Sequence, residues 1–405
     1  LTTEQHKFFV FDNGIIEKTA KELNVGDLLI LPQNIEINGK SRKLEKIGHT
    51  VYYEPNEEKL EENRNSKALY WHLKRRDRNV SNKTLKLLGI DPDERFSPVG
   101  NHINSISFPE ETNPKLMRFL GYYFGDGSRD RKGIKFKDAR VEILQEYLQL
   151  AKDLFSIEGK ISREGNWYVL RIDSTQLLKW LDLNFPDVTD KRFPEWIGRL
   201  TDEEIFAFIG GIYDAEGFVT KKARSLVISM TDEFATRAIQ LLLLRAGILA
   251  SISYPKSSKR HRKQPIRLQV SNREYVLRFL QKVGGYISGI KRRDVEILLD
   301  ELKGCVYQHI KIPIPKDELR RSFGIKALRG RGYPMVKTIL KHGNGKVLEY
   351  SGQYPNSPIV FQRVLKVEKV DYDGYVYDIE VEKYHNFIAN GIITHNSRWA
   401  THGKP

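Results

Sequence analysis

The stretches "FLGYYFGDG" (119–127) and "IGGIYDAEG" (209–217) decide the fold, because together they form an internal repeat. Each is an apolar stretch with helical spacing that ends in an acidic residue followed by glycine. Aligned without gaps, they place Asp126 opposite Glu216, at an offset of 90 residues (216 − 126 = 90). A fixed offset with matching surroundings indicates an internal duplication.

The order of elements after each motif also repeats. After the first motif, an alternating segment "GIKFKD" sets Lys135 and Lys137 on one face, as in a half-buried strand. A helical pattern over 139–155 and a strand over 166–173 follow. After the second motif come a strand, a helix, a strand and a helix, at 225–232, 233–247, 265–272 and 273–283. Each half is therefore predicted to combine helices with a small sheet whose exposed face is polar.

Small residues share one face of each motif helix. Gly121 and Gly125 are four residues apart, as are Gly211 and Ala215. Because a glycine inside a helix costs up to about 1 kcal/mol relative to alanine, it calls for a reason. One glycine pair is adequately explained as tolerated in a core helix, but two pairs in register favour two helices whose backbones touch.

Such packing would bring Asp126 and Glu216 together at the C-terminal ends of two helices. Helix C-termini carry partial negative charge, so two carboxylates there repel each other and the helix dipoles. A divalent cation relieves that repulsion, and oxygen ligands beside a phosphate suit Mg²⁺. Metal held between carboxylates and a phosphate is an arrangement for phosphodiester hydrolysis.

Residues 110–300 resemble the LAGLIDADG homing endonucleases in their single-chain, two-motif form. The resemblance implies an αββαββα unit repeated with pseudo-two-fold symmetry, two sheets that straddle DNA, and Asp126 and Glu216 as the metal-binding catalytic acids. It also implies one basic residue late in each half, here Lys191 and Lys291. For these two lysines, an ordinary surface role remains an equal alternative.

Both ends of the chain are β-rich, whereas its middle is α+β. At the N-terminal end, Asn13–Gly14 lies between alternating apolar residues, as in a hairpin, and "ELNVGDLLILP" (22–32) predicts a helical turn and a strand. At the other end, Asp373–Gly374 and Asn390–Gly391 predict two further hairpins. A single β domain, split around an inserted module, is the economical interpretation.

The N-terminal end resembles the block of an intein's Hint splicing domain that carries a T-x-x-H pair, here Thr3 and His6. The resemblance implies that both residues activate the upstream splice junction. Inteins begin with a Cys or Ser nucleophile, whereas this sequence starts at Leu1, already inside the block. The first splicing block is therefore expected to lie outside the chain, either cropped or on a separate chain.

The C-terminal end resembles the last two blocks of the same domain, in "VYDIEVEKYHNF" (376–387) and "GIITHN" (391–396). The resemblance implies that Asp378 assists proton transfers and that His385 and His395 promote cyclisation of Asn396. Ser397 would then accept the acyl chain. The side-chain amide of Asn396 can attack its own carbonyl, and His395 is placed to protonate the departing amine. No cofactor is expected for splicing.

The last nine residues, "SRWATHGKP" (397–405), resemble a stretch in the glutamine amidotransferase domain of glucosamine-fructose-6-phosphate aminotransferases. Asn396 would then be the last intein residue and Ser397 the first residue of such a host. The host's catalytic cysteine and sugar-phosphate domains are not in this sequence.

Composition limits the function further. The 405 residues carry a net charge of +15 and 40% hydrophobic residues. No apolar run reaches the roughly 18 residues of a membrane span, and no leader is visible, so a cytoplasmic protein without a membrane partner is expected. The one cysteine, Cys305, excludes an internal disulfide framework and a multi-cysteine zinc site.

The basic residues gather in clusters that suggest a polyanionic partner. Each cluster alone is better explained as a solvated face, but together they favour one long positive surface on both sides of the two motifs. The clusters are 72–80, 129–137, 256–263, 290–294 and 319–332. We expect a monomer that binds double-stranded DNA at a long asymmetric site, the intein-free host allele.

The predicted architecture is α+β: a two-repeat endonuclease inserted in an all-β Hint domain. Residues 35–109 and 301–359 remain open, as linkers or as accessory DNA-contacting regions. The predicted segments are 1–34 (Hint), 35–109 (accessory), 110–300 (endonuclease), 301–359 (accessory), 360–396 (Hint) and 397–405 (host). Two rivals are a binding module with a dead nuclease, which both acids argue against, and a free-standing endonuclease, which leaves the Hint blocks unexplained.

Overall fold

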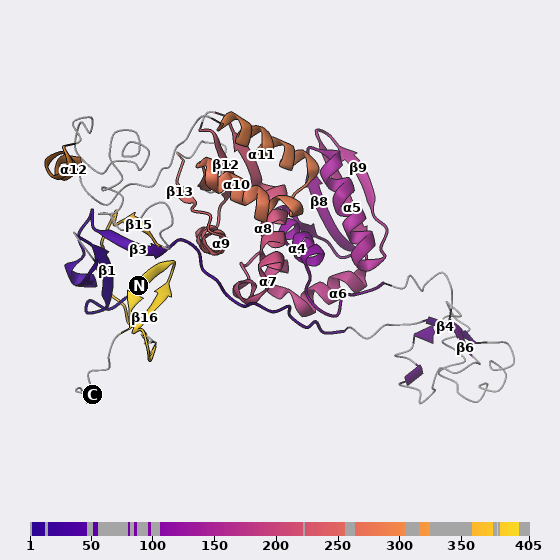
Figure 1. The fold of residues 1–405 in the computed structure, drawn as a ribbon. Coiled ribbons are helices and arrows are strands. Elements are labelled where there is room, and N and C mark those ends of the chain that lie inside the picture. The colour runs from indigo at the N-terminus through magenta and orange to yellow at the C-terminus, as the bar shows by residue number, and fades with distance from the viewer. Residues whose placement is uncertain are drawn as a thin grey trace. The chain divides into compact units, whose positions relative to one another are not determined.

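The computed structural model describes most of the repeat region and both ends of the chain (Figure 1). The described residues are 2–12, 15–46, 52–55, 80–81, 85–86, 96–98, 106–221, 223–255, 264–303, 316–324, 359–375, 379 and 381–396. They form two compact units, Lys40–Ala215 and Leu1–Gly39 with Glu216–Pro405. Each unit is described by itself.

The first repeat lies in the unit Lys40–Ala215 and alternates helices with paired strands. Its elements are α4 (Pro114–Asp126), β7 (Ser128–Arg129), β8 (Gly133–Asp138), α5 (Val141–Phe155), β9 (Lys160–Glu164), β10 (Trp167–Asp173), α6 (Thr175–Asn184), α7 (Pro186–Thr189) and η3 (Glu195–Arg199). Helix α8 (Asp202–Glu216), which carries the second motif, lies in the same unit up to Ala215. The strands form an antiparallel sheet in the order β7-β8-β10-β9. Ile134 and Phe136 are buried and Lys137 is exposed, so the alternation read from the sequence is confirmed.

Helices α4 and α8 touch through their glycines, as the sequence predicts, and they lie side by side in Figure 1. A methyl group added at Gly121 would collide with the main-chain carbonyl of Phe208 and lie 3.1 Å from Gly211 Cα. One added at Gly211 would collide with the carbonyl of Arg118. Because each obstacle is backbone, no side-chain rotation makes room for a Cβ at either position.

The second repeat belongs to the other unit and has the same order of elements after its motif. These elements are β11 (Gly217–Thr220), β12 (Ser225–Met230), α9 (Glu233–Arg245), β13 (Ser251–Ser253), β14 (Ile266–Val270), α10 (Arg273–Lys282), η4 (Gly284–Tyr286) and α11 (Gly289–Glu301). The sheet order β11-β12-β14-β13 matches that of the first repeat strand for strand. The duplication inferred from the 90-residue offset is therefore confirmed in the fold.

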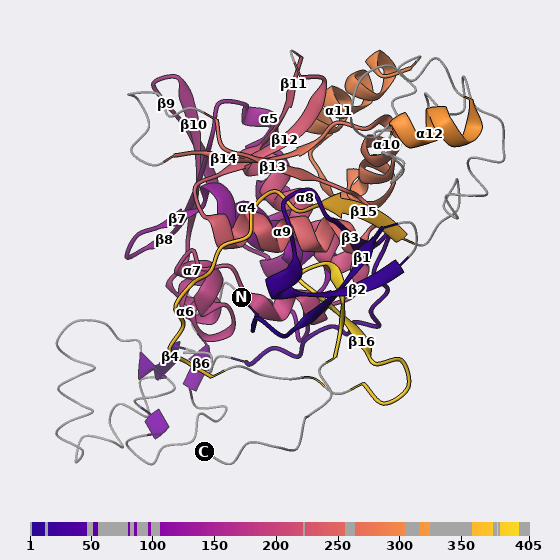
Figure 2. The same ribbon diagram turned by 90° about the vertical axis from the view of Figure 1, so that its left-hand side faces the viewer.

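Strands from both ends of the chain form one six-stranded sheet in the unit Leu1–Gly39 with Glu216–Pro405 (Figure 2). Its strands are β1 (Lys7–Phe11), β2 (Ile15–Thr19), β3 (Leu28–Pro32), β15 (Ile359–Arg363), β16 (Asn386–Ala389) and β17 (Ile392–His395). The order is β15-β3-β1-β17-β16, with β2 paired to β1. Phe8 lies opposite Thr394, and Val360 opposite Leu31, so the predicted split β domain is confirmed.

The predicted turns have different outcomes. Asn390 and Gly391 join β16 to β17 with φ of +51° and +80°, the positive pair that a two-residue hairpin turn requires. Strands β1 and β2 pair around Asn13–Gly14, which lies outside the described residues, and η1 (Ala20–Glu22) supplies the helical turn before β3. The hairpin predicted at Asp373–Gly374 is wrong, because the described residues 364–375 form no strand. Its turn signal is local, whereas a hairpin also needs a paired strand on each side.

Few other elements are described. Strands β4 (Tyr52–Pro55), β5 (Val80–Ser81) and β6 (Phe96–Pro98) form a three-stranded sheet in the order β5-β4-β6. Helix α12 (Lys316–Phe323) lies within 301–359, the second of the two regions that the sequence analysis left open as linker or accessory DNA-contacting region. Among the described residues, no helix is both long and apolar enough to cross a membrane.

Candidate functional site

His6, directly before β1, is held by Thr394 of the neighbouring strand β17. The buried Thr394 hydroxyl donates its only proton to the carbonyl oxygen of Lys7, at 2.8 Å. Its contact with His6 Nε2, at 2.5 Å, must therefore be one in which Nε2–H donates to the hydroxyl oxygen. This contact sets the tautomer and direction of the imidazole. Thr3 is exposed, and its carbonyl accepts from the main-chain N–H of His6 at 3.2 Å.

Asn396 is buried directly after β17, and its polar groups face the loop before β16. Its main-chain N–H donates to the carbonyl of His385 at 2.9 Å. The orientation of its side-chain amide that satisfies both neighbours has Nδ2 donating to His385 O at 2.7 Å and Oδ1 accepting from Val381 N at 3.0 Å. His385 has a φ of +49°, a left-handed conformation that aims its carbonyl at both N–H groups.

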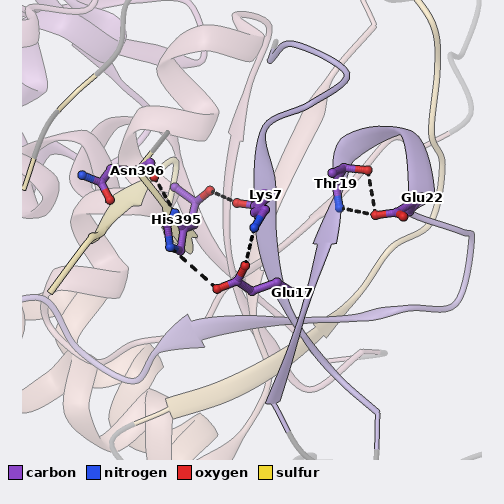
Figure 3. Close-up of polar contacts among 7 residues, drawn as sticks. Lys7, Glu17, Thr19, Glu22, His395 and Asn396 are labelled. Atoms are coloured by element: carbon purple, nitrogen blue, oxygen red, sulfur yellow. Dashed lines mark hydrogen bonds and ion pairs between the residues drawn. The ribbon is translucent and has the colours of Figure 1, made fainter. Parts of the chain in front are cut away.

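His395 lies between the Asn396 carbonyl and a carboxylate (Figure 3). Its Nδ1 contacts the main-chain oxygen of Asn396, and because a carbonyl can only accept, Nδ1 carries the proton. Its Nε2 lies 3.7 Å from Glu17 Oε1. Glu17 in turn accepts from Lys7 Nζ at 2.8 Å, and this hydrogen bond is the main cause that lowers the pKa of Glu17. Partial burial opposes the shift, and the charges of Lys7 and His395 add to it.

Two predicted splicing residues, Asp378 and Ser397, lie outside the described residues. The structure brings His6, His385, His395 and Asn396 to one region of the sheet through β1, β17 and the loop before β16. It adds Thr394 and Glu17, which the sequence analysis missed. Both contacts depend on the pairing of β1 with β17, which is not readable from local sequence.

The two predicted basic residues lie at the ends of the motif helices. Lys191, with a φ of +60°, donates to the carbonyls of Tyr123 and Phe124 in the last turn of α4, the latter at 3.2 Å. The buried Lys291 donates to the carbonyl of Gly217, directly after α8. A cation at a helix C-terminus binds carbonyls that have no partner within the helix and complements the dipole.

The second motif contains two acids, and their environments differ. Asp214 is fully buried, where it accepts from Arg118 at 3.0 Å and from Tyr147 Oη at 3.0 Å. Burial, followed by the charge of Asp214, raises the pKa of Tyr147 well above its ordinary value. Glu216 is half-buried as the last residue of α8, and Asp126 is exposed as the last residue of α4. Asp214 is thus committed to the core, which leaves Glu216 as the counterpart of Asp126.

The described basic clusters are only partly available to a partner. In the cluster 129–137, Arg129 and Lys135 pair with Asp182 and Asp130, while Lys137 lies 5.6 Å from the ring of the half-exposed Trp167. In the cluster 290–294, the alternative of an ordinary surface role for Lys291 is wrong, since this side chain is buried. The clusters 72–80 and 256–263 lie almost wholly outside the described residues, and 319–332 does so beyond residue 324.

The sequence profile of the family described as "Intein splicing domain" matches residues 1–396. The chain belongs to this intein family. The matched region ends at Asn396, the residue whose carbonyl His395 contacts. The two repeats within it have the αββαββα element order that the sequence resemblance to LAGLIDADG homing endonucleases implies.

The intein is similar to regions of much longer proteins. It is 35% identical to the glutamine–fructose-6-phosphate aminotransferase (isomerizing) of Methanocaldococcus jannaschii, over all of this chain and 40% of that protein. It is 25% identical to elongation factor 2 of Methanopyrus kandleri, over 98% of this chain and 35% of that protein. The chain therefore spans less than half the length of these relatives.

Solved structures of the homing endonuclease I-DmoI are similar to part of this chain. One match covers 42% of this chain and 94% of that endonuclease, at 19% identity and a TM-score of 0.34. Other structures of I-DmoI contain DNA together with Ca or Mn. In the part of this intein that is described, no group of three or more His, Cys, Asp or Glu side chains is placed to hold a metal ion.

Proposed function

We propose that the intein releases its C-terminal flank by cyclisation of Asn396. The side-chain Nδ2 attacks the residue's own carbonyl carbon, and the bond from that carbon to the nitrogen of Ser397 breaks. Nδ2 loses one proton and the departing nitrogen gains one, so the products are a five-membered imide and a free amine. The observation that carries the proposal is the pair of hydrogen bonds that His385 O and Val381 N make with the buried side-chain amide of Asn396.

His395 serves this step at the carbonyl. Its Nδ1–H donates to the oxygen on which negative charge develops when the carbon is attacked. The nitrogen of Ser397 is bonded to the same carbon, so the ring lies beside the bond that breaks. The position therefore supports charge stabilisation in addition to the proton donation expected from the sequence.

The upstream junction is assigned to residues in the same region of the sheet, around His6. We propose that His6, with Thr3, activates the bond before the intein, that Asp378 assists proton transfers, and that Ser397 accepts the acyl chain. The Thr394 contact supports this role for His6, because it holds the imidazole in one tautomer.

Release of the peptide that starts at Ser397, followed by mass spectrometry in the full-length precursor, tests the C-terminal step. Asn396→Ala should abolish release because alanine has no nucleophile. His395→Ala should slow release by roughly 10²–10⁴-fold, the usual contribution of general acid–base help. Asn390→Gly is the matched control: it removes an amide from the same hairpin, and glycine accepts a φ of +51°. Undiminished release by Asn396→Ala would refute the proposal.

We further propose that the two repeats form a Mg²⁺-dependent endonuclease with Asp126 and Glu216 as metal ligands. These residues fit a hard cation: each is a carboxylate at a helix C-terminus that retains solvent access, while Asp214 is occupied by Arg118 and Tyr147. Mg²⁺ is typically held by one or two carboxylates plus substrate phosphates. When bound, the ion would polarise the phosphodiester and activate water.

Lys191 and Lys291 support this assignment by their equivalent placement. Each donates to main-chain carbonyls at or just after the end of a motif helix. We propose that they hold those helix ends and supply positive charge beside the carboxylates. The exposed faces of both sheets add aromatic and basic side chains for DNA, with Lys137 beside Trp167 in one and Arg267 beside Phe218 in the other.

A plasmid that carries the intein-free host allele tests the nuclease. Asp126→Asn or Glu216→Gln should abolish Mg²⁺-dependent double-strand cutting and spare binding, because phosphate contacts supply most of the affinity. Asp130→Asn removes an exposed carboxylate four residues from Asp126 and should leave cutting intact. Wild-type protein that binds this DNA without cutting it would favour the alternative, a binding module with a dead nuclease.

The host is proposed to be a glutamine–fructose-6-phosphate aminotransferase. The tail "SRWATHGKP" (397–405) follows Asn396, and the 35% identity to the archaeal protein of that name covers this whole chain. The proposed target is thus the long asymmetric site formed where the two halves of that host gene join. The match of residues 1–396 to the intein splicing family argues against the alternative of a free-standing endonuclease, because it includes both β-rich ends of the chain.

A further inference from the structure

We propose that Glu17 is a positioning residue for the C-terminal cleavage step: it holds the imidazole of His395 so that Nδ1–H faces the Asn396 carbonyl. Figure 3 shows the arrangement, with Glu17 on β2 between Lys7 and His395. The inference rests on the proposed cyclisation of Asn396 and adds a residue that neither the T-x-x-H block nor the C-terminal blocks contain.

The first step of the argument concerns the ring. An imidazole on a strand can rotate about its side-chain bonds, and only one orientation presents Nδ1–H to the Asn396 oxygen. Its Nε2 faces Glu17 Oε1 at 3.7 Å, within ion-pair distance. In the imidazolium form both ring nitrogens carry protons, so a carboxylate on that side attracts Nε2–H and favours the orientation that places Nδ1–H at the carbonyl. The ring of Phe9, 5.9 Å from that of His395, lies on the same side of the hairpin.

The second step concerns the carboxylate itself. The two oxygens of the Glu17 carboxylate have different partners: Oε2 accepts a hydrogen bond from Lys7 Nζ at 2.8 Å, and Oε1 faces His395. Lys7 and Glu17 lie on neighbouring strands, with Glu17 directly opposite Phe9, so the β1–β2 pairing fixes where the carboxylate stands. The hydrogen bond from Lys7 is also the main reason that the pKa of Glu17 lies below its ordinary value, which keeps the group ionised.

The third step joins the two ends of the chain. Lys7 anchors Glu17 through its side chain, and its main-chain carbonyl accepts from Thr394, the residue before His395. The carboxylate and the imidazole that it positions are therefore carried by strands fastened to each other at the same residue. The N-terminal hairpin thus supplies a group that acts at the C-terminal junction.

Glu22 provides a matched control. It is another glutamate close in sequence to this hairpin, but its carboxylate caps η1, where Oε2 accepts from the Thr19 N–H and the Thr19 hydroxyl, both at 2.8 Å (Figure 3). Glu17→Gln and Glu22→Gln each remove one negative charge from the same region of the sheet. Only the first removes the charge that faces His395.

The test measures the rate of release of the Ser397 peptide from the full-length precursor in a double-mutant cycle. Glu17→Gln should slow release roughly tenfold, well inside the contribution of the histidine that it serves. Glu22→Gln should release at the wild-type rate. In a His395→Ala background, Glu17→Gln should cause no further slowing, because the ring it positions is gone. A purely structural role of Glu17 would slow release equally in both backgrounds.

Each other outcome decides the matter. Wild-type release by Glu17→Gln, with release abolished in Asn396→Ala, overturns the role of Glu17 and leaves cyclisation standing. Equal slowing with and without His395 also overturns it. Undiminished release by Asn396→Ala removes the proposed function itself. Should Glu17→Gln melt below the wild-type protein, Glu17→Asp serves as the second variant: it retains the charge and should restore part of the rate.

Discussion

Replacing Gly121 with alanine tests the contact that joins the two motif helices. The new Cβ would collide with the Phe208 carbonyl and lie 3.1 Å from Gly211 Cα, so α4 and α8 must separate. Overpacking of this kind costs about 1–3 kcal/mol, and the upper end applies because backbone cannot rotate away. Alanine recovers up to about 1 kcal/mol in helix propensity. The net loss is about 2 kcal/mol.

For a unit of the size of Lys40–Ala215, each 1 kcal/mol shifts the melting temperature by about 2–4 °C, so the expected drop is about 4–8 °C. Fluorescence of the fully buried Trp180 reports the melt within this unit. Gly198→Ala is the control, because no described atom lies within 4 Å of its added Cβ, and it should melt at or slightly above the wild-type temperature. Gly121→Ala melting at or above wild type would refute the close packing.

Three further predictions follow from single contacts. Thr394→Val removes the hydroxyl that receives the imidazole N–H of the T-x-x-H block, and should slow cleavage at the upstream junction about tenfold while C-terminal release continues; an unchanged upstream rate would contradict the assignment. Arg118→Met removes one of the two donors described above for the buried Asp214 and leaves the Tyr147 hydroxyl, so it should lower the free energy of unfolding in urea by about 3–5 kcal/mol. Adding Asp214→Asn should recover part of that loss, whereas purely additive losses would argue against the ion pair. The Lys135 ammonium holds the pKa of Asp130 at about 2, below its usual 3.8, so the carboxylate's contribution to stability is present above about pH 4 and is lost as the pH falls toward 2; Lys135→Met should return this pKa toward 3.8 in an NMR titration, and a pKa that stays near 2 would exclude the lysine as its cause.

Features encoded by local periodicity were predictable from the sequence. The offset between Asp126 and Glu216, the alternation of "GIKFKD" and the Asn390–Gly391 turn all depend on residues that are close along the chain. The matched sheets and the close helix packing follow from those patterns. The placement of Lys191 and Lys291 at the two helix ends could be named only through a family resemblance, because each lysine lies far along the chain from its carbonyl partner.

The failures arise where pairing joins distant residues. The contact of His6 with Thr394 and that of Glu17 with His395 each span more than 370 residues, so no local pattern announces them. The hairpin predicted at Asp373–Gly374 was wrong because a local signal was present without the long-range strand pairing that a hairpin needs. A turn dipeptide is a local signal, and the described chain around it, with Tyr375 85% exposed, has no paired strand.

The mass of the intein fragment released from its C-terminal flank tests the central claim most directly. Cyclisation of Asn396 leaves a terminal imide, which is lighter by one water than the asparagine acid left by simple hydrolysis of the same bond. The arrangement of His385, His395 and Asn396 predicts the imide mass in freshly released fragment, together with a free amine on Ser397. Fresh fragment that carries only the hydrolysed asparagine acid would show that the bond is broken by water and would contradict the account.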